Sequence, residues 1–310
     1  MIPTYEPGPY LLETIDSVLQ QDMGAERMQI MVVDDASPRA DVASLLAAAR
    51  SAGRVNLIRN PDNVGLAGNW NECIRHARGQ LVHILHQDDL VLPGFYQRLG
   101  DELTQNPAAG MAFSGCAFID EVGSITDYAR PERRTPGLIN HWLNHISRRY
   151  SVHCPAALVR RSTYERLGGY RLDLRYALDW EMWVRIAANT PVWYDPMILA
   201  KYRSHAANET ARLNESHQTF SDELQAISIF AEHLPSNQRE QLMSRTYRRF
   251  ADSRLRRAKK LLRNHRTADA QYHLSAVRMA VEHIPSKLLR KFYALRIAMI
   301  QQRMPAVSAR

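Results

Sequence analysis

Two adjacent carboxylates, Asp88 and Asp89, follow the apolar stretch Leu81–Leu85. A buried strand that ends in paired acids puts negative charge at the carboxyl edge of a sheet, where open α/β sheets bind their ligands. Because neighbouring carboxylates repel each other, a cation normally lies between them, and a hard divalent cation that carries phosphates is the usual one. A solvated turn after a strand gives the same two residues, so the pair needs support from elsewhere in the chain.

A second acid pair, Asp34 and Asp35, follows the short apolar run Gln29–Val33. Strand and helix patterns alternate up to Leu85, which predicts a parallel sheet with helices on both faces. Strands that share a polarity end at the same edge of a sheet. We therefore expect the two acid pairs to lie at one edge, and two pairs on equivalent strand ends are much less common by chance than one.

The elements that must position these acids can be predicted from hydrophobic spacing. Further strands are expected at Val55–Arg59, Gly110–Asp120, His153–Val159, Val192–Tyr194 and Ile198–Tyr202, and helices at Tyr10–Gln21, Val42–Ala52, Ala67–Ala77, Phe95–Gln105, Ser162–Leu167 and Leu178–Ala188. The segment Val122–Arg149 is polar and irregular, with a helix expected around Ile139–Ile146.

After about Leu213 the pattern becomes almost entirely helical. The expected helices are Thr219–Glu232, Asn237–His265, Thr267–His283 and Ser286–Arg303, and the expected N-caps are Ser236, Thr267 and Ser286. We therefore divide the chain into an α/β domain, residues 1–212, and a basic helical region, residues 213–310.

The net charge of +8 is unevenly distributed. Residues 239–310 carry 18 Lys+Arg against 4 Asp+Glu, or +14, which leaves 22 against 28, or −6, for residues 1–238. A basic helical region can bind anionic lipid, nucleic acid or an acidic partner, or it can be a solvated surface. We expect no nucleic acid, because interleaved aromatic residues and a recognisable nucleic-acid-binding module are absent.

Composition excludes several classes of protein. No stretch approaches the ~18 consecutive apolar residues of a membrane span, and the first ten residues lack the basic and apolar parts of a signal peptide. The cysteines Cys73, Cys116 and Cys154 are far apart and odd in number, which favours neither disulfides nor a zinc site and fits a reducing compartment. We expect a cytoplasmic protein, with peripheral contact at the inner face of the membrane as the alternative to a free one.

Seven segments of the chain resemble the family-2 glycosyltransferases, in the order and spacing of that family. They are IPTYEPGPYLLETIDSVLQQ, VVDDAS, NVGLAGNWN, LHQDDLVLPG, the GGY of residues 168–170, LDWEMWVRI and YRSHAAN. Each segment alone is weak, but seven across residues 2–210 are specific. The resemblance, which extends to rhamnosyltransferase-like members, implies the A-type glycosyltransferase fold. This is an α/β fold with a mostly parallel, Rossmann-like sheet flanked by helices, here followed by an all-helical extension.

The resemblance implies an inverting transfer of a sugar from a nucleotide-diphosphate sugar to a hydroxyl of a glycan or lipid-linked acceptor, in cell-surface polysaccharide or glycolipid synthesis. A divalent metal, Mn²⁺ or Mg²⁺, on Asp88 and Asp89 would offset the charge of the diphosphate as it leaves. His205 matches a histidine that often reaches the metal. Asp179 matches the catalytic carboxylate, although an acid at a helix start is also favoured by the helix dipole. Glu181 is the neighbouring alternative.

The same matches imply a set of residues around the nucleotide sugar. They are Pro3, Thr4, Tyr5, Asp34, Asp35, Asn63, Asn71, Gln87 and Arg203. An aspartate in such a set can accept a hydrogen bond from a base N–H or from ribose hydroxyls, and an arginine can pair with phosphate.

Three departures from the family pattern weaken the enzyme interpretation. His86 stands at the first acid of the usual Asp-x-Asp-Asp motif, and Trp70 stands where an arginine is common. The chain also begins where the first strand of the family should already have ended. We therefore expect that strand to be missing, and either a start codon farther upstream or an impaired product. The alternative function is a non-catalytic protein that binds nucleotide sugars or serves as a scaffold.

Overall fold

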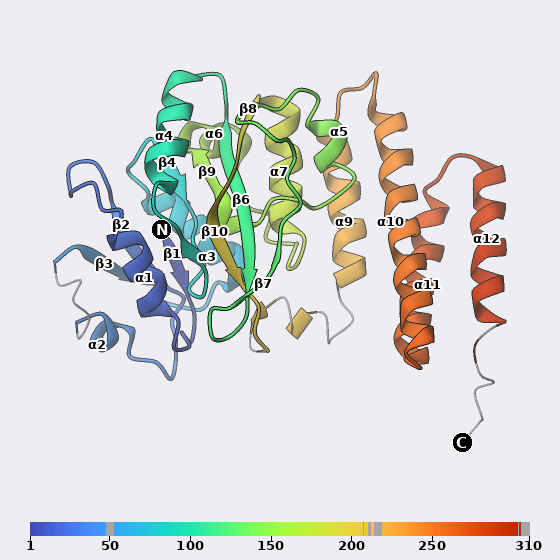
Figure 1. Cartoon of the computed structure of the whole chain (residues 1–310), viewed down its shortest axis with the longest axis horizontal. Helices are drawn as coiled ribbons and strands as arrows, with labels where there is room; N and C mark the ends of the chain where they lie inside the picture. Colours follow the sequence, from blue (N-terminus) through green and yellow to red (C-terminus); the bar gives the residue numbers. More distant parts are fainter. Residues whose placement is uncertain (48–52, 207, 210–211, 214–218, 303, 305–310) are drawn as a thin grey trace.

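The structure is a computed structural model that describes residues 1–47, 53–206, 208–209, 212–213, 219–302 and 304. Two sheets that meet side by side are flanked by helices, and a stack of further helices follows (Figure 1). This arrangement confirms the predicted α/β fold with a helical C-terminal extension. The predicted helix Val42–Ala52 is observed as α2 (Val42–Ala47), and the rest of that prediction lies outside the described residues.

A parallel sheet of three strands, in the order β1-β2-β3, forms the N-terminal part. Its strands are β1 (Ile2–Thr4), β2 (Ile30–Asp34) and β3 (Val55–Arg59). Thr4 is aligned with Asp34, and Asp34 with Arg59, so the three strands end together. In the chain, helix α1 (Leu11–Leu19) connects β1 to β2, and helix α3 (Gly65–His76) connects β3 to β4 (Leu81–His83) of the second sheet.

The presence of β1 differs from the expectation that the first strand is missing. All three residues of β1 are buried, and they pair with Val32–Asp34. The N-terminal ammonium of Met1 donates to the carbonyl of His83 at 2.9 Å, and the N–H of Leu85 donates to the carbonyl of Met1 at 3.0 Å. These two bonds have the pattern of a parallel pair, so a very short strand joins the two sheets.

The second sheet is mixed, with its main strands in the order β4-β9-β6-β10-β5. They are β4 (Leu81–His83), β9 (Ala157–Arg160), β6 (Met111–Ile119), β10 (Val192–Arg203) and β5 (Leu90–Val91). β6 and β10 are parallel, whereas β9 is antiparallel to both of its neighbours and β5 is antiparallel to β10. Parallel pairing therefore dominates the first sheet but not the second.

Three predicted segments differ in detail. Val192–Tyr194 and Ile198–Tyr202 form one strand, β10, because the irregular register around Pro196 interrupts the hydrophobic pattern but not the pairing. His153–Val159 begins with a 3₁₀ turn, η1 (Cys154–Ala156), before β9, since Pro155 has no N–H to donate to a ladder. The irregular segment also contains two short strands, β7 (Ile125–Tyr128) and β8 (Gly137–Leu138), besides α5 (Leu143–Ile146).

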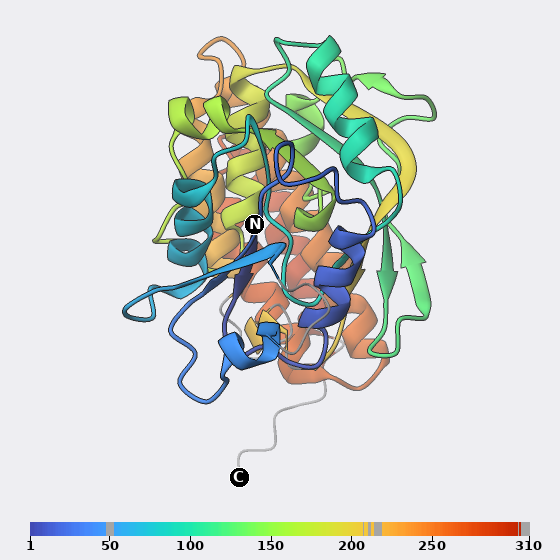
Figure 2. The ribbon, with the colours of Figure 1, turned by 90° about the vertical axis from the view of Figure 1, so that its left-hand side faces the viewer.

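Helices cover the sheets and then stack outward from them. α4 (Phe95–Gln105), α6 (Arg161–Leu167) and α7 (Leu178–Asn189) pack around the second sheet, as Figure 2 shows from the side. Beyond α7 lie α9 (Thr219–Phe230), the turn η2 (Ala231–His233), α10 (Arg239–Arg263), α11 (Thr267–Glu282) and α12 (Lys287–Gln301), with α12 outermost (Figure 1).

One hydrophobic core runs through both predicted regions of the chain. The same buried cluster contains Trp180 of α7, Phe230 of α9 and Leu255 of α10. The rings of Trp180 and Phe230 are 5.4 Å apart at an angle of 69°. The helices after Leu213 are therefore packed against the α/β part, and the boundary between residues 212 and 213 stays a prediction.

The expected helix caps are only partly correct. Ser286 caps α12, accepting a hydrogen bond from the N–H of Leu289 at 3.3 Å. Ser236 is not a cap, because a turn from Pro235 delays the start of α10 until after Gln238. Thr267 is the first residue of α11 rather than its cap, which is Arg266.

Two further observations concern the cysteines and the character of the helices. Cys73, Cys116 and Cys154 are all buried and free. Among the described residues, no helix has the length and apolar character needed to cross a bilayer.

Candidate active site

The carboxyl ends of β2 and the β4 segment lie at one edge, as predicted for the two acid pairs, and the end of β1 lies there as well. The N–H of Asp35 donates to the carbonyl of Thr4 at 2.8 Å. The side-chain amide of Gln87 bonds both backbone groups of Tyr5, accepting from its N–H at 3.1 Å and donating to its carbonyl at 3.2 Å. Gln87 therefore ties the loop of the second acid pair to the end of β1.

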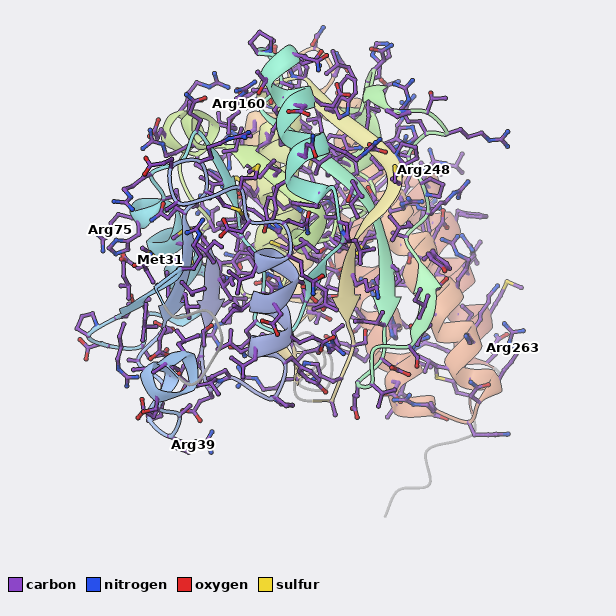
Figure 3. The ribbon with its side chains drawn as sticks, turned by 60° about the vertical axis from the view of Figure 1, so that its left-hand side comes forward. Met31, Arg39, Arg75, Arg160, Arg248 and Arg263 are labelled. Carbon is purple, nitrogen blue, oxygen red and sulfur yellow. The ribbon has the colours of Figure 1, made fainter. Side chains whose placement is uncertain are left out.

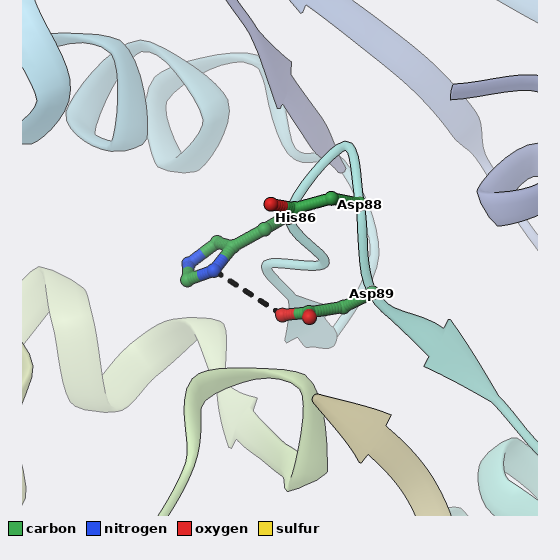
Figure 4. A group of neighbouring side chains, drawn as sticks. All are labelled: His86, Asp88 and Asp89. Carbon is green, nitrogen blue, oxygen red and sulfur yellow. Dashed lines mark ion pairs between the residues drawn. The ribbon is translucent and has the colours of Figure 1, made fainter. Parts of the chain in front are cut away.

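Three side chains after β4, His86, Asp88 and Asp89, form a group whose ligand atoms all lie within 4.8 Å of one another (Figure 4). Nδ1 of His86 is 3.3 Å from Oδ2 of Asp89. Within the described residues, Oδ2 of Asp89 and Nε2 of His86 are buried atoms that lack a hydrogen-bond partner. Burial raises the pKa of Asp89 to about 6, while His86 acts in the opposite direction. The group thus has buried ligand atoms that its own chain leaves unused.

A second histidine completes this group from the far end of β10. Nε2 of His205 is 2.9 Å from Oδ2 of Asp88, and this ion pair raises the pKa of His205 above its usual value. The two side chains are 12% and 18% exposed, so both can be reached from solvent. A cavity of about 300 Å³ opens beside them, and Tyr10 also lines it. The structure therefore brings together the three residues predicted as metal ligands.

The donor set fits a divalent cation. Orphaned oxygen and nitrogen atoms at Asp89 and His86, and the accessible carboxylate of Asp88, are the kinds of ligand that Mn²⁺ accepts. Magnesium prefers oxygen ligands alone, so a histidine at this position favours manganese. His86 was predicted only as a departure from the family pattern, and the geometry instead makes it a candidate ligand.

Arg203 supports the acid pair from within the protein. Its side chain is 1% exposed, and its backbone N–H donates to Oδ1 of Asp89 at 2.9 Å. The guanidinium donates to the carbonyl of Asp88 at 2.9 Å and to Glu13 at 2.6 Å. We expected Arg203 to pair with phosphate, but these contacts make it the residue that holds the 88–89 backbone in place.

The carboxylates of the first acid pair already accept hydrogen bonds from donors of the protein. Oδ1 of Asp34 accepts from the side chain of Ser37 at 2.5 Å, and its Oδ2 accepts from Arg59 at 2.5 Å. The carboxylate of Asp35 accepts from the N–H groups of Val64 and Gly65, at 2.9 Å each, and from Asn60 at 2.9 Å. Both side chains are buried, and they fasten β2 to β3 and to the start of α3.

The other residues predicted around the donor fall into two groups. Pro3 and Thr4 are buried in β1, so Tyr5, which is 45% exposed, is the one of the three with an open side chain. Asn63 is exposed and donates to the carbonyl of Asp35 at 3.1 Å. Asn71 instead exchanges both amide hydrogen bonds with the backbone of Tyr170, at 2.7 and 2.8 Å, so it positions the segment before α7.

Asp179 lies in the first turn of α7 as a buried carboxylate near His86 of the metal-ligand group. Its Oδ2 accepts from the hydroxyl of Tyr150 at 2.6 Å, and its Oδ1 accepts from the N–H of Trp180 at 2.7 Å. Burial raises the pKa of Asp179 to about 6, although Tyr150 and the nearby His86 act to lower it. A carboxylate of this kind is ionised at neutral pH and is more basic than an exposed aspartate.

Glu181, the alternative base, serves another purpose. It is fully buried and forms a bidentate pair with Arg185, at 2.7 and 2.9 Å. Arg185 in turn donates to the carbonyls of Leu167 and Gly169. Two residues along the helix from Asp179, Glu181 thus points away from the site and holds the glycine turn after α6.

Two residues of the site have no motif and were missed by sequence reasoning. Tyr150, one residue after the segment expected to be irregular, orients Asp179. Asp222 of α9 accepts three backbone hydrogen bonds, from Arg175, Tyr176 and Ala177, at 2.9, 2.8 and 2.6 Å. It thereby fixes the turn immediately before Asp179. Neither contact is local in sequence, and no pattern around these residues signals it.

Several known proteins are similar to this chain. The model of a family described as Glycosyl transferase family 2 matches residues 1–168. The protein MT1568 of Mycobacterium tuberculosis (strain CDC 1551 / Oshkosh) is 31% identical over 223 residues, which cover 68% of this chain and 68% of that protein. The succinoglycan biosynthesis protein ExoU of Rhizobium meliloti (strain 1021) is 30% identical over 174 residues, which cover 53% of this chain and half, 50%, of ExoU.

A solved structure has the same fold over almost the whole chain. The crystal structure of S. aureus TarS 1-349 in complex with UDP-GlcNAc matches with a TM-score of 0.71 and 14% identity, covering 97% of this chain and 87% of that one. At this level of identity the likeness shows the fold alone. It includes the C-terminal helices, because nearly the whole chain is covered.

Proposed function

This chain belongs to glycosyl transferase family 2, and from that premise we propose that it transfers a sugar from a nucleotide-diphosphate sugar to an acceptor hydroxyl with inversion. The observation that carries the proposal is Asp179, a buried carboxylate with a pKa of about 6 next to the group of His86, Asp88 and Asp89. A base and a metal-ligand group on two sides of one site are what an inverting displacement requires.

In this proposal Asp179 is the general base. Its carboxylate would accept the proton of the acceptor hydroxyl as the new glycosidic bond forms, and Tyr150 and the N–H of Trp180 hold it in position. Attack from the side of Asp179, with the diphosphate departing on the opposite face of the sugar, inverts the anomeric centre. Tyr5 and Asn63 are the open side chains nearest the ends of β1 and β2, so we assign them to the nucleoside.

A divalent metal, Mn²⁺ or Mg²⁺, held by His86, Asp88, Asp89 and His205 would act as a Lewis acid on the diphosphate. The two histidines lead us to expect stronger binding of Mn²⁺. Free Mn²⁺ gives a sharp electron paramagnetic resonance signal. A titration that follows this signal therefore measures metal binding without turnover. We expect wild type to bind one Mn²⁺ and Asp88→Ala to bind at least about tenfold more weakly.

The test of activity is release of nucleoside diphosphate from a panel of nucleotide sugars, with Mn²⁺, Mg²⁺ or chelator. Wild type should release product from one donor when metal is present, and Asp88→Ala and Asp179→Asn should not. Asp101→Ala, an exposed change on α4, is the matched control and should behave as wild type. Donor binding without turnover, unaltered in Asp179→Asn, would instead favour the alternative function of a non-catalytic nucleotide-sugar-binding or scaffold protein.

We further propose that the reaction takes place at the cytoplasmic face of a membrane, on a glycan or lipid-linked acceptor of cell-surface polysaccharide or glycolipid synthesis. The similarity to ExoU, a succinoglycan biosynthesis protein, supports the pathway. The outer face of α12 supports the location, because Leu288, Phe292, Leu295 and Met299 are 50–78% exposed at helical spacing. Basic residues such as Lys287 and Lys291 accompany them, a combination that suits an anionic lipid surface.

The membrane proposal is tested by sedimentation with phosphatidylglycerol vesicles. Replacing Leu288, Phe292 and Leu295 together by Gln should abolish co-sedimentation, whereas Met279→Gln on α11, which also changes an exposed apolar residue, should not. Equal sedimentation of wild type and the triple variant would show that α12 does not bind the membrane.

A further inference from the structure

A second cavity, of about 390 Å³, lies between the segment after α5 and helix α10, away from the metal-ligand group. Most of its lining is cationic. Five arginines line it: Arg148, Arg149, Arg245, Arg248 and Arg249. Figure 3 labels Arg248 on α10, on the helical side of the molecule. The arginines come from two elements that are about 100 residues apart in sequence, so only the packing of α10 brings them together.

The positive charge of this cavity is only partly balanced. Its two acids are Glu132 and Asp252, against five arginines. Glu132 lies 3.5 Å from Arg149, and Asp252 pairs at 2.7 Å with Arg296, outside the lining. In the described parts of the chain, no carboxylate forms an ion pair with Arg148, Arg245 or Arg249. Burial and the repulsion of Arg245 and Arg249 accordingly lower the pKa of Arg148.

A buried hydrogen-bonding group also faces this cavity. Ser151 is part of the lining, and its Oγ is inaccessible to solvent without a hydrogen-bond partner among the described residues. A buried hydroxyl normally has a partner. Uncompensated guanidinium groups and an unused hydroxyl are together the donors that bind a phosphate group.

The cavity is connected to the proposed base by the segment 146–151. Tyr150 lies between two lining residues, Arg149 and Ser151, and donates to Asp179. The segment is fastened on both sides, since Ile146 accepts from the indole of Trp180 at 2.6 Å and Ser147 accepts from Thr246 of α10 at 3.0 Å. A group bound in the cavity is therefore held at a defined place relative to Asp179.

We propose that this cavity binds a phosphate group carried by the acceptor, and so directs an acceptor hydroxyl toward Asp179. The proposal rests on the proposed glycosyltransferase function, but it concerns a phosphate other than the donor diphosphate, which belongs at Asp88. It names the acceptor class as a phosphorylated alcohol, either a soluble phosphate ester or a lipid phosphate. The basic charge of α10 then has a specific use in substrate recognition.

The test is calorimetric titration with glycerol 3-phosphate, at constant ionic strength, with chelator and without donor. Wild type should bind, and the variant Arg245→Gln with Arg249→Gln should bind at least about tenfold more weakly, because two charge-assisted contacts are lost. The matched control is Arg256→Gln with Arg257→Gln, which removes the same charge from exposed residues of α10 outside the cavity. It should bind as wild type does.

Two further arms separate this site from the donor site and identify the source of the phosphate. Asp88→Ala should bind glycerol 3-phosphate as wild type does, even if no donor is ever turned over, so failure of the proposed function is distinguishable. Titration with phosphatidic acid vesicles, compared with phosphatidylcholine vesicles, shows whether a lipid phosphate is bound more tightly than the soluble ester.

Several results would overturn the proposal. These are no binding of either phosphate probe by wild type, equal weakening in both double-arginine variants, or loss of binding in Asp88→Ala with retention in Arg245→Gln, Arg249→Gln. Thermal unfolding of each variant is measured in parallel. Arg249→Lys provides a conservative check, since it keeps the charge but loses the planar guanidinium and should weaken binding less than Arg249→Gln.

Discussion

At the end of β2, the carboxylates of Asp34 and Asp35 accept hydrogen bonds from side chains and backbone groups of the loops around them. At the same edge, beyond β4, Asp88 shares its carboxylate with His205, and Oδ2 of Asp89 has no hydrogen-bond donor among the described residues. The two pairs have the same sequence, Asp-Asp, and follow strands of the same polarity, yet their surroundings differ.

The difference lies in how many protein donors each carboxylate receives. Asp35 receives three, two of them from the N-terminus of α3, so its negative charge is already stabilised and a cation would add little. Asp89 is buried with one backbone donor, the neighbouring carboxylate of Asp88, and the ring of His86 at 3.3 Å, so its charge is less fully stabilised than that of Asp35. The first pair therefore fastens the fold, and the second is suited to a ligand.

The largest expected effect is on turnover in Asp88→Ala. Because this change removes the most accessible ligand of the group, metal-dependent release of nucleoside diphosphate should fall on the order of a thousandfold. The unfolding midpoint should change little, since His205 is the only side-chain partner of Asp88 among the residues that the structure describes. If Asp88→Ala keeps full activity, the second acid pair is not the metal-binding site, and the proposed difference in role between the two pairs is wrong.

The next effect is on stability in Asp35→Ala. Removing this carboxylate leaves the buried N–H groups of Val64 and Gly65 without an acceptor, so the free energy of unfolding should fall by about 3 kcal/mol. Denaturant unfolding measures this change, and Asp62→Ala, an exposed change in the same loop, should be nearly neutral. If Asp35→Ala is instead as stable as wild type but does not bind donor, Asp35 belongs to the site and the two pairs are alike.

A smaller effect, on kcat, is expected in Asp222→Ala. Asp222 extends the comparison, because its carboxylate, like that of Asp35, accepts hydrogen bonds from backbone N–H groups. The turn before α7 would lose three hydrogen bonds, and Asp179 would be less well positioned. We expect kcat to fall about tenfold with little change in donor KM. A proportional rise in KM would indicate that Asp222 acts on donor binding instead.

The smallest effect concerns the pH dependence that Tyr150 imposes on Asp179. The base must be ionised, so the rate should fall as the pH falls through the pKa of Asp179, about 6. The hydroxyl of Tyr150 stabilises the ionised form, and its removal in Tyr150→Phe should move this limb to higher pH. We expect about threefold less activity than wild type at pH 6 and about equal activity at pH 8. If the pH–rate profile of Tyr150→Phe is the same as that of wild type, the hydroxyl of Tyr150 does not influence the pKa of Asp179.

Much of the fold was predictable because it depends on local patterns. Phe95–Gln105 and Val55–Arg59 occur at the residues predicted from their periodicity. The convergence of both acid pairs at one edge followed from strand polarity alone. Errors occurred where the local pattern was weak, as in the short strand Ile2–Thr4, whose stability comes from its pairing with β2 and with the β4 segment.

The sequence by itself determined the α/β fold, the family, and the candidate carboxylates Asp88 and Asp179. Only the tertiary structure decided which side chains are free to act. Arg203 and Asn71 match donor motifs, but they donate to the backbone carbonyls of Asp88 and Tyr170, which are 115 and 99 positions away in the chain. Asp222 and the arginine cavity have no motif at all. The physical reason is that a hydrogen-bond partner is supplied by the packing of distant elements, whereas hydrophobic periodicity records only which face of each element is buried.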